Sequence, residues 1–493
     1  MVKNKKTDIT ETTVNKGEKE KQLSAKKISA STPHETCTEA LTAFGGLFAL
    51  IKFFDLVGFE QIFEHCFTKP ERTPKLGHYR MVLGVIVLLF IGFTRIGHFS
   101  YIRCDALVIR FFQVACLPVV STFWRYVNSL GINQSRSLLQ IAGVLRERVW
   151  QQCGINHERI AIDIDTTVET VFGEQQGARV GHNPRNRGKK GYRPVVAFIE
   201  QTREYVYGKL RSGTTVSGQE AAQFIREIGR YLPGCVKAVL VRADSEFFSW
   251  ETIRALVDRW YDFIISAKSC HPPFDPAGWY RLKRGENIEY NECVYAPIGW
   301  GWDMRFVAMR IAKSPDKQTG PTQQALFEED RFTYRIFCTS RREKPHTVIE
   351  EYDKRADVEN LVGEAKREGL EAIPSKKFKN NAAWFQLVML SYNIWRYLKI
   401  LAHKSIGEQA SAAAEAKPLH GIQDNTIRIA RLKLLYIAAK TPYHGNYTTV
   451  KYSEQDMRTP GLMRLLDFLD EARRQAKAWL NGSWQCRFSL NTS

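Results

Sequence analysis

Hydrophobic residues recur at helical spacing through the first third of the chain, after a polar start. Between residues 34 and 150 this repeat runs through Leu41–Leu56, Met81–Phe93, Ala106–Cys116 and Leu138–Val149. Leu117-Pro118 ends one helix, and Ser121-Thr122 can cap another at Phe123–Leu130. We therefore predict a helical N-terminal region over residues 34–150, preceded by a disordered basic tail over residues 1–33.

The predicted helix at 123–130 carries Arg125, Tyr126 and Asn128. A short break, a Ser/Thr cap and a helix with polar side chains are compatible with a helix-turn-helix that reads a DNA groove. The same pattern occurs in ordinary helical hairpins. The sequence leaves both interpretations open.

At Arg159 the repeat changes to strict alternation, which is typical of a strand. Ile160, Ile162 and Ile164 fall on one face, whereas Asp163 and Asp165 fall on the other. Buried carboxylates need compensation, either from a divalent cation or from a partner Lys or Arg. Both explanations remain possible from the sequence.

Further strands and helices alternate up to residue 267. Asp244 follows the predicted strand Ala238–Arg242, and Ser217 with Glu220 forms a capping box at the start of a helix. We predict an α/β unit over 155–267 whose other elements are strands at Pro194–Glu200, Glu204–Leu210 and Asp262–Ala267 and a helix at Ser249–Trp260.

Residues 268–345 are predicted to be rich in strands, at Ile288–Ala296, Met304–Ile311 and Phe332–Cys338. Trp300 and Trp302 lie between the first two, and such tryptophans either support a nucleic-acid base or belong to a core. A long apolar helix is expected at Asn381–Leu401, a linker at 404–418, and further helices at Leu419–Thr441 and Gly461–Leu480.

Charge indicates the kind of partner. Lys and Arg number 71 against 52 Asp and Glu, giving a net charge of +19. This excess favours a polyanionic partner, nucleic acid before an anionic membrane surface. The longest apolar run, Met81–Phe93, has thirteen residues, whereas a bilayer span needs about twenty. We expect no membrane partner and no secretory signal, and ten cysteines without zinc-type spacing suggest thiols in a reducing cytoplasm.

A cationic loop is predicted between Gly173 and Arg193, where the sequence reads GEQQGARVGHNPRNRGKKGYR. Tyr192 could stack on a base, and the five cations are suited to backbone phosphates. The alternative is an ordinary solvated loop. The cations are Arg185, Arg187, Lys189, Lys190 and Arg193.

The stretch YDKRADVENLVGEAK carries polar residues at helical intervals of three, four and seven. These residues are Tyr352, Arg355, Glu359 and Lys366, which would share one helix face. A carboxylate between two cations is suited to holding a metal ion beside phosphate. A solvated helix with stabilising charge pairs would look similar.

The spacing Tyr-x2-Arg-x3-Glu-x6-Lys resembles the signature of a branch of bacterial insertion-sequence DDE transposases, of the kind called transposase DDE domain group 1. This resemblance implies an RNase H-like catalytic core formed by 155–267 and 346–403 and interrupted by the β-rich insertion 268–345. It also implies that the helical region 34–150 binds DNA, with a helical C-terminal region at 419–493. Asp165, followed by two threonines, best matches the first catalytic aspartate, with Asp163 as the alternative. RADS around Asp244 resembles the second motif.

The resemblance implies that Asp165, Asp244 and Glu359 are catalytic and hold two Mg²⁺ or Mn²⁺ ions. Tyr352, Arg355 and Lys366 would contact DNA phosphates, and Trp300 or Trp302 a flipped base. The implied partners are double-stranded DNA (terminal inverted repeats and target) and a second copy of the chain in a bacterial cytoplasm. The alternatives are a nuclease of the same fold that never joins strands, and an inactive DNA-binding relic.

Overall fold

The structure is a computed structural model that describes residues 28–480 except 182, 184–185, 269, 285–286, 313–331, 408–413 and 445–446. The chain divides into two compact units, Met1–Glu39 and Ala40–Ser493. Most of the tail predicted over 1–33 lies outside the described residues, as does Arg185.

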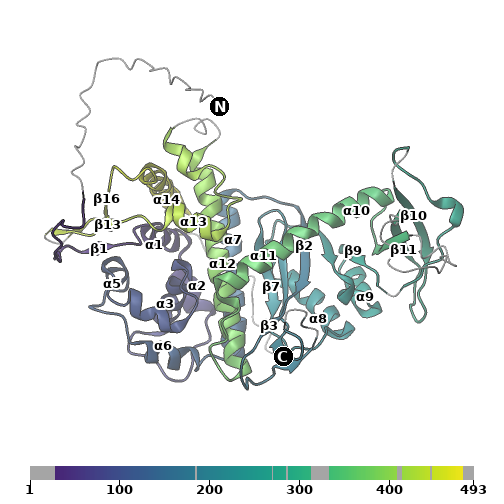
Figure 1. Ribbon diagram of the computed structural model, residues 1–493, viewed down its shortest axis with the longest axis horizontal. Coiled ribbons are helices and arrows are strands. Elements are labelled where there is room, and N and C mark those ends of the chain that lie inside the picture. Colours follow the sequence, from purple (N-terminus) through teal and green to yellow (C-terminus); the bar gives the residue numbers. More distant parts are fainter. Residues whose placement is uncertain are drawn as a thin grey trace, which may run out of the picture. The chain divides into compact units, whose positions relative to one another are not determined.

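An eight-stranded sheet, with strand order β10-β11-β12-β9-β8-β2-β6-β7, forms the right-hand side of the second unit in Figure 1. The pairs β2–β8 and β8–β9 are parallel, and the remaining pairs are antiparallel. The expected α/β class is therefore confirmed, and the structure adds that the sheet is mixed. The strands are β2 (Arg159–Thr166), β6 (Val195–Ile199), β7 (Glu204–Lys209), β8 (Ala238–Ala243), β9 (Asp262–Ser266), β10 (Ile288–Tyr295), β11 (Met304–Ala312) and β12 (Phe332–Thr339).

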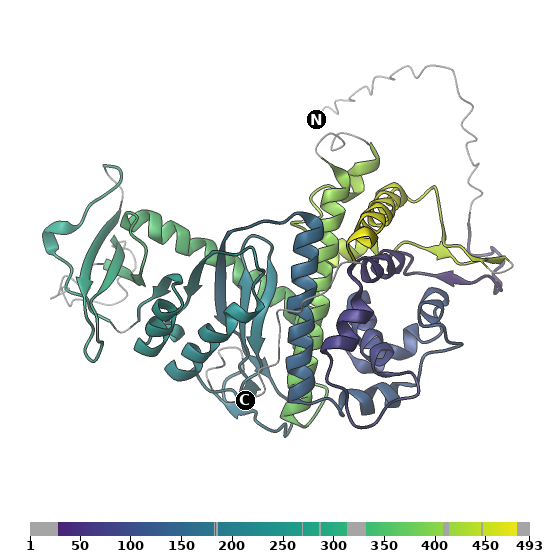
Figure 2. The same cartoon turned by 180° about the vertical axis from the view of Figure 1, so that it is seen from behind.

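The strand with alternating carboxylates, β2, lies in the interior of the sheet. Ile162 pairs with Ile199 of β6 on one side and with Val241 of β8 on the other. Helices α8 (Gly218–Ile228) and α9 (Trp250–Asp258) cover one face of the sheet, and α10 (Pro345–Asp353) with α11 (Asp357–Ala365) runs along the other (Figures 1 and 2). Because both faces are covered, Asp163 is buried and Asp165 is only partly accessible.

The strands predicted over 268–345 continue the central sheet. Cys338 of β12 is in register with Ile265 of β9, and β11 and β10 then add outward. The insertion and the strand that follows Asp244 are therefore parts of one hydrogen-bonded surface. Because β12 pairs with β9 and β9 pairs with β8, the insertion is joined by backbone hydrogen bonds to the strand that precedes Asp244.

Two long helices, α7 (Ile132–Cys153) and α12 (Phe378–Ile406), pack side by side next to the sheet (Figure 2). Helix α12 is buried along nearly its whole length, and Trp395 stacks on Phe90 at 4.1 Å between ring centres. The other helices of the N-terminal region are α1 (Leu47–Val57), α2 (Phe59–Cys66), α3 (His78–Ile91), α4 (Phe99–Ile102), α5 (Ala106–Phe112) and α6 (Val120–Val127).

The first elements of the second unit contact the last ones that the structure describes. Strand β1 (Leu41–Thr42) pairs with β13 (Ala439–Lys440), which also pairs with β16 (Lys451–Tyr452), and α1 contacts α14 (Thr459–Leu480). The prediction of a helix across Leu419–Thr441 is wrong, since only α13 (Ile427–Leu434) is α-helical there. Pairing with β1 draws residues 439–440 into a strand instead. A short hairpin, β14 (Tyr443–His444) with β15 (Tyr447–Thr448), follows β13.

The apolar run predicted as a buried helix is α3, whose residues from Met81 to Ile91 are buried. Within the described ranges, no single helix is long and apolar enough to cross a membrane. By length and composition, one pair passes that test together, His78–Ile91 with Ile96–Ile102, and it is bent by 92°.

Candidate active site

The predicted helix over 352–366 is divided into three segments. Helix α10 ends at Asp353, a 3-10 turn covers Lys354–Ala356, and α11 runs from Asp357 to Ala365. Lys366 begins a π-helical turn that extends to Leu370. The segment is therefore helical as expected, but a 3-10 turn separates Tyr352 on α10 from Glu359 on α11. The 3-10 turn narrows the helix at Arg355, whose side chain is directed toward β2 and is buried.

Asp163 is compensated by a protein cation. Arg242 on β8 donates from Nε and Nη2 to the two carboxylate oxygens of Asp163, at 2.6 and 2.8 Å, and both residues are buried. Arg242 also forms ion pairs with Glu200 at 3.1 Å and with Glu351 at 3.2 Å. Of the two explanations left open by the sequence, the arginine partner applies to Asp163.

Asp165 lies beside the 3-10 turn. Arg355 Nη2 donates to Asp165 Oδ1 at 2.9 Å and to the Ile164 carbonyl at 3.0 Å. Burial raises the pKa of Asp165 from 3.8 to about 6, Arg355 opposes this rise, and the negative charges of Asp244 and Glu359 add to it. Asp244, after β8, and Glu359, on α11, thus both act on Asp165 although they are distant from it in the sequence.

Asp244 follows β8 directly and caps a 3-10 turn, since its Oδ1 accepts from the Glu246 amide at 3.1 Å. Burial raises its pKa, and the positive charge of Arg355 opposes the rise. Glu359, by contrast, is exposed in the first turn of α11. Tyr352 interacts with the same groups. Burial raises its pKa, the positive charge of Arg355 lowers it, and the negative charges of Asp244 and Asp165 raise it further.

A fourth acid, Glu246, was missed by the sequence analysis. Its Oε2 accepts from Arg193 Nη2 at 2.6 Å and from Thr166 Oγ1 at 2.9 Å, and its Oε1 accepts from the Val216 amide at 2.7 Å. Thr166 follows Asp165, and Glu246 stands two positions after Asp244. Glu246 therefore joins the two strand ends that carry the aspartates. Only its position near Asp244 hinted at this role.

Lys366 also lies against β2 and its continuation. Its ammonium donates to the Val168 carbonyl at 2.8 Å and stands 3.7 Å from Glu169 Oε1. Glu169 is buried, and burial raises its pKa to about 7, an effect that Lys366 opposes and Glu371 increases. This buried carboxylate was also missed, because a single Glu after two threonines has no motif to distinguish it.

The donor chemistry of the three acids suits hard divalent cations. Asp165, Asp244 and Glu359 offer carboxylate oxygens, which Mg²⁺ and Mn²⁺ prefer. In the part of the chain that the structure describes, no three Asp, Glu, His or Cys side chains are close enough together to make a ready metal site. Arg355 instead provides the positive charge that Asp165 contacts. The residues fit the ions in donor chemistry, while Arg355 occupies one oxygen of Asp165 in this structure.

The predicted cationic loop is divided between surface and interior. Arg187, Lys189 and Lys190 are exposed. Tyr192 is fully buried, its hydroxyl donates to the Gln176 carbonyl at 2.7 Å, and its ring meets Phe378 edge-on. Tyr192 is thus a core residue in this structure and is not placed to stack on a base, while Arg193 is engaged by Glu246.

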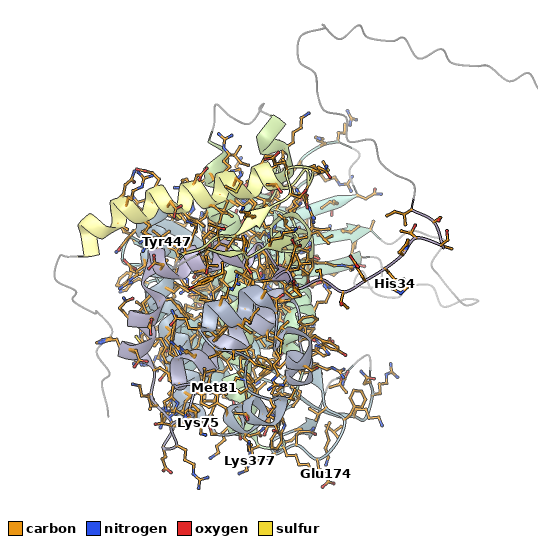
Figure 3. All side chains as sticks on the ribbon, turned by 90° about the vertical axis from the view of Figure 1, so that its left-hand side faces the viewer. His34, Lys75, Met81, Glu174, Lys377 and Tyr447 are labelled. Carbon is orange, nitrogen blue, oxygen red and sulfur yellow. The ribbon has the colours of Figure 1, made fainter. Side chains whose placement is uncertain are left out.

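A second run of cations lies beside this loop. The Gln176 amide donates to the Lys376 carbonyl at 2.8 Å, which brings Lys376, Lys377 and Lys379 next to it, all exposed. Figure 3 shows Lys377 close to Glu174 of the loop at one end of the unit. Together with Arg187, Lys189 and Lys190 we call these residues the basic rim.

The two tryptophans of the insertion contact Trp250, in the segment that follows Asp244. Trp250, at the start of α9, lies 5.6 Å from Trp300 and 4.8 Å from Trp302 between ring centres. Trp300 also contacts Phe248 at 5.2 Å, whereas Trp302 is 44% exposed. The cluster therefore has an inner member, Trp300, and an outer member, Trp302, and both contact Trp250, which follows Asp244 by six positions.

The helix considered as a groove reader is α6. Its N-cap is Val119, without a side-chain hydrogen bond, so the Ser121-Thr122 cap is wrong. Tyr126 is buried, Arg125 and Trp124 are exposed, and Asn128 accepts a hydrogen bond from Ser375 Oγ at 2.5 Å. Only part of the predicted reading face is on the surface.

Comparison with known proteins was informative at the level of families. The family model described as transposase DDE domain group 1 matches residues 23–474. Among solved structures, the chain is similar to the piggyBac transposase seen by cryo-EM in a synaptic complex with hairpin DNA, with 10% identity, 92% of this chain and 86% of that chain covered, and a TM-score of 0.39. No curated protein matches the sequence.

Proposed function

The chain belongs to the transposase DDE domain group 1 family, and from this premise we propose that it binds the terminal inverted repeats of its insertion sequence, cleaves the DNA ends and joins them to target DNA. The proposal includes an RNase H-like catalytic core, a homodimer in the synaptic complex and action in a bacterial cytoplasm. The observation that carries it is the ion pair at 2.9 Å between Arg355 of the signature segment and Asp165, the carboxylate whose pKa Asp244 and Glu359 also raise.

Asp165, Asp244 and Glu359 are the catalytic carboxylates of this proposal. Asp163 is left out because Arg242 already occupies both of its oxygens. Two bound Mg²⁺ or Mn²⁺ ions would neutralise charge on the attacking and leaving oxygens of the phosphodiester. The three carboxylates would hold these ions, with Asp165 central because both other acids act on it.

Arg355 has two roles in this scheme. Without DNA it donates to Asp165 and limits the repulsion among the acids. When the site is loaded, its guanidinium would turn to a DNA phosphate, which it can bind with two parallel hydrogen bonds. Tyr352 and Lys366 would orient phosphates from the same side. The exposure of Glu359 is consistent with a residue that completes the site on closure.

DNA would reach the site over the basic rim. Its exposed cations suit backbone phosphates, which set affinity and register rather than sequence preference. Trp302, the outer member of the tryptophan cluster, would support an unpaired base near the cut. Arg185 falls outside the described residues and stays a sequence prediction.

The test uses purified full-length protein and the DNA that flanks its own gene. We expect shifted bands on binding, cleavage only with Mg²⁺ or Mn²⁺, and joining of a pre-cut end to plasmid DNA. Asp165→Asn, Asp244→Asn and Glu359→Gln should each lower cleavage by about a thousandfold or more and leave binding within about twofold. Asp353→Asn, at an exposed surface ion pair with Arg335, is the matched control.

Each alternative has its own outcome in that experiment. Cleavage without joining of the pre-cut end would indicate a nuclease of the same fold. Binding without cleavage by the unaltered chain would indicate an inactive relic. Normal cleavage by any of the three acid variants would remove that residue from the site.

A further inference from the structure

Two cysteines in the N-terminal helical region lie in direct contact. Cys104 Sγ and Cys116 Sγ are 3.2 Å apart, within hydrogen-bonding distance for two thiols. Cys104 is exposed and Cys116 is partly exposed. Both thiols are therefore accessible to a reagent in solution, unlike the buried Cys66, Cys153 and Cys338.

The backbone holds the two thiols together. After α5 the chain reverses at Gln113, whose φ is +51°. The Leu117 amide then donates to the Arg103 carbonyl at 3.0 Å, and Arg103 Nε donates to the Leu117 carbonyl at 2.7 Å. These bonds join the neighbours of both cysteines. Forming a disulfide bond of about 2.05 Å therefore requires only a small movement of the side chains.

We propose that Cys104 and Cys116 form a redox modification site, which a low-molecular-weight disulfide such as glutathione disulfide converts reversibly to an intramolecular disulfide. The disulfide would link the two ends of the segment 104–116, which contains α5 and is followed by α6. It is independent of the proposed transposase activity, because its evidence is the thiol geometry alone.

The exchange proceeds in two balanced steps. The Cys104 thiolate attacks one sulfur of glutathione disulfide, so that a mixed disulfide forms and one glutathione thiolate leaves. The Cys116 thiolate then attacks the Cys104 sulfur, and the second glutathione leaves. The two cysteines lose two protons and two electrons, and glutathione disulfide is reduced to two glutathione molecules. The hydrogen bond with Cys104 raises the pKa of Cys116, which fits Cys104 as the first nucleophile.

The sequence provides a direct assay. Trypsin cleaves after Arg103, Arg110 and Arg125, so the two cysteines fall on separate peptides, 104–110 and 111–125. The full chain, carrying Cys486→Ser because Cys486 lies outside the described residues, is treated with glutathione disulfide and digested without reductant. We expect the two peptides to be joined, and to separate again with dithiothreitol.

Single-cysteine variants make the test decisive. In Cys104→Ser and Cys116→Ser the remaining thiol should keep a stable glutathione adduct and no joined peptides should form. Cys37→Ser, at another exposed cysteine, should behave like the parent. The melting temperature should rise on oxidation of the parent and not of the two variants. Separate glutathione adducts on Cys104 and Cys116 in the parent, or peptides joined through Cys37, would overturn the proposal.

Discussion

Arg355 Nη2 lies 2.9 Å from Asp165 Oδ1, although the two residues are 190 positions apart in the chain. This ion pair joins the 3-10 turn between α10 and α11 to the end of β2. It couples the arginine of the sequence signature to a carboxylate whose pKa burial raises to about 6. The first prediction follows from this coupling.

Asp165→Asn is expected to stabilise the protein while abolishing cleavage. The pKa of Asp165 is raised in the folded protein from 3.8 to about 6, so the folded state binds the extra proton and wild-type stability falls as pH rises from about 4 to about 6. Above pH 6 the ionised carboxylate costs on the order of 1–3 kcal/mol, and asparagine removes that cost. Thermal unfolding of the variant and of wild type at pH 4 and pH 8 measures this cost. The variant should be more stable than wild type at pH 8 and differ little from it at pH 4. A variant less stable than wild type at pH 8 would contradict the pKa assignment.

Asp163→Asn should have the opposite effect on stability, although burial raises the pKa of Asp163 as well, because Arg242 donates to both oxygens of this carboxylate. The substitution leaves the buried Arg242 with only part of its carboxylate partners, Glu200 and Glu351. Removing one partner of a buried ion pair costs about 3–5 kcal/mol, and urea unfolding at pH 7.5 is the measurement. If Asp163→Asn folds with wild-type stability yet fails to cleave DNA, Asp163 is the catalytic residue.

Glu246→Gln should slow cleavage by about tenfold to a hundredfold. The amide loses the ion pair with Arg193, which weakens the link between the two aspartate-bearing strand ends. Because Glu246 positions the aspartates, the loss should appear in the cleavage rate while DNA affinity is unchanged. Glu158→Gln, which loses an exposed ion pair with Lys237, is the control. Equal loss in both variants would indicate a general effect on stability.

Substitution of the two tryptophans of the insertion should have different effects, one mainly on stability and the other mainly on cleavage. Trp300→Ala removes an inner contact with Phe248 and Trp250, and should lower the free energy of unfolding by about 2–4 kcal/mol. Trp302→Ala should cost less stability, because its side chain is 44% exposed, yet reduce cleavage of end DNA severalfold. Unchanged cleavage by Trp302→Ala would assign that tryptophan to surface packing alone.

The basic rim should account for part of the salt dependence of DNA binding. Replacing Arg187, Lys189 and Lys190 by alanine should reduce the slope of log affinity against log salt by about 2–3, because each phosphate that is no longer neutralised lowers the slope by about 0.9. Stability should change by no more than about 0.5 kcal/mol for each substitution, since all three are exposed. A slope equal to that of wild type would remove these cations from the DNA path.

Local sequence patterns were enough to predict the α/β class, the strands around Asp165 and Asp244, the capping box at Ser217 and the buried character of α3. These features depend on local periodicity and on caps within a few residues. The family signature also lies within fifteen consecutive positions, from Tyr352 to Lys366. Residues that are close together in the sequence are therefore enough to determine these features.

The tertiary structure determines which basic residue pairs with each carboxylate. Asp163 and Asp165 are equivalent in the strand pattern, yet β8 supplies Arg242 to the first and the 3-10 turn supplies Arg355 to the second. Glu246 and Glu169 gained their roles from packing, and Tyr192 became core because Phe378 and Asn381 enclose it. Burial and partner charges come from segments distant in sequence, so the compensation of a carboxylate depends on how the sheet and helices assemble.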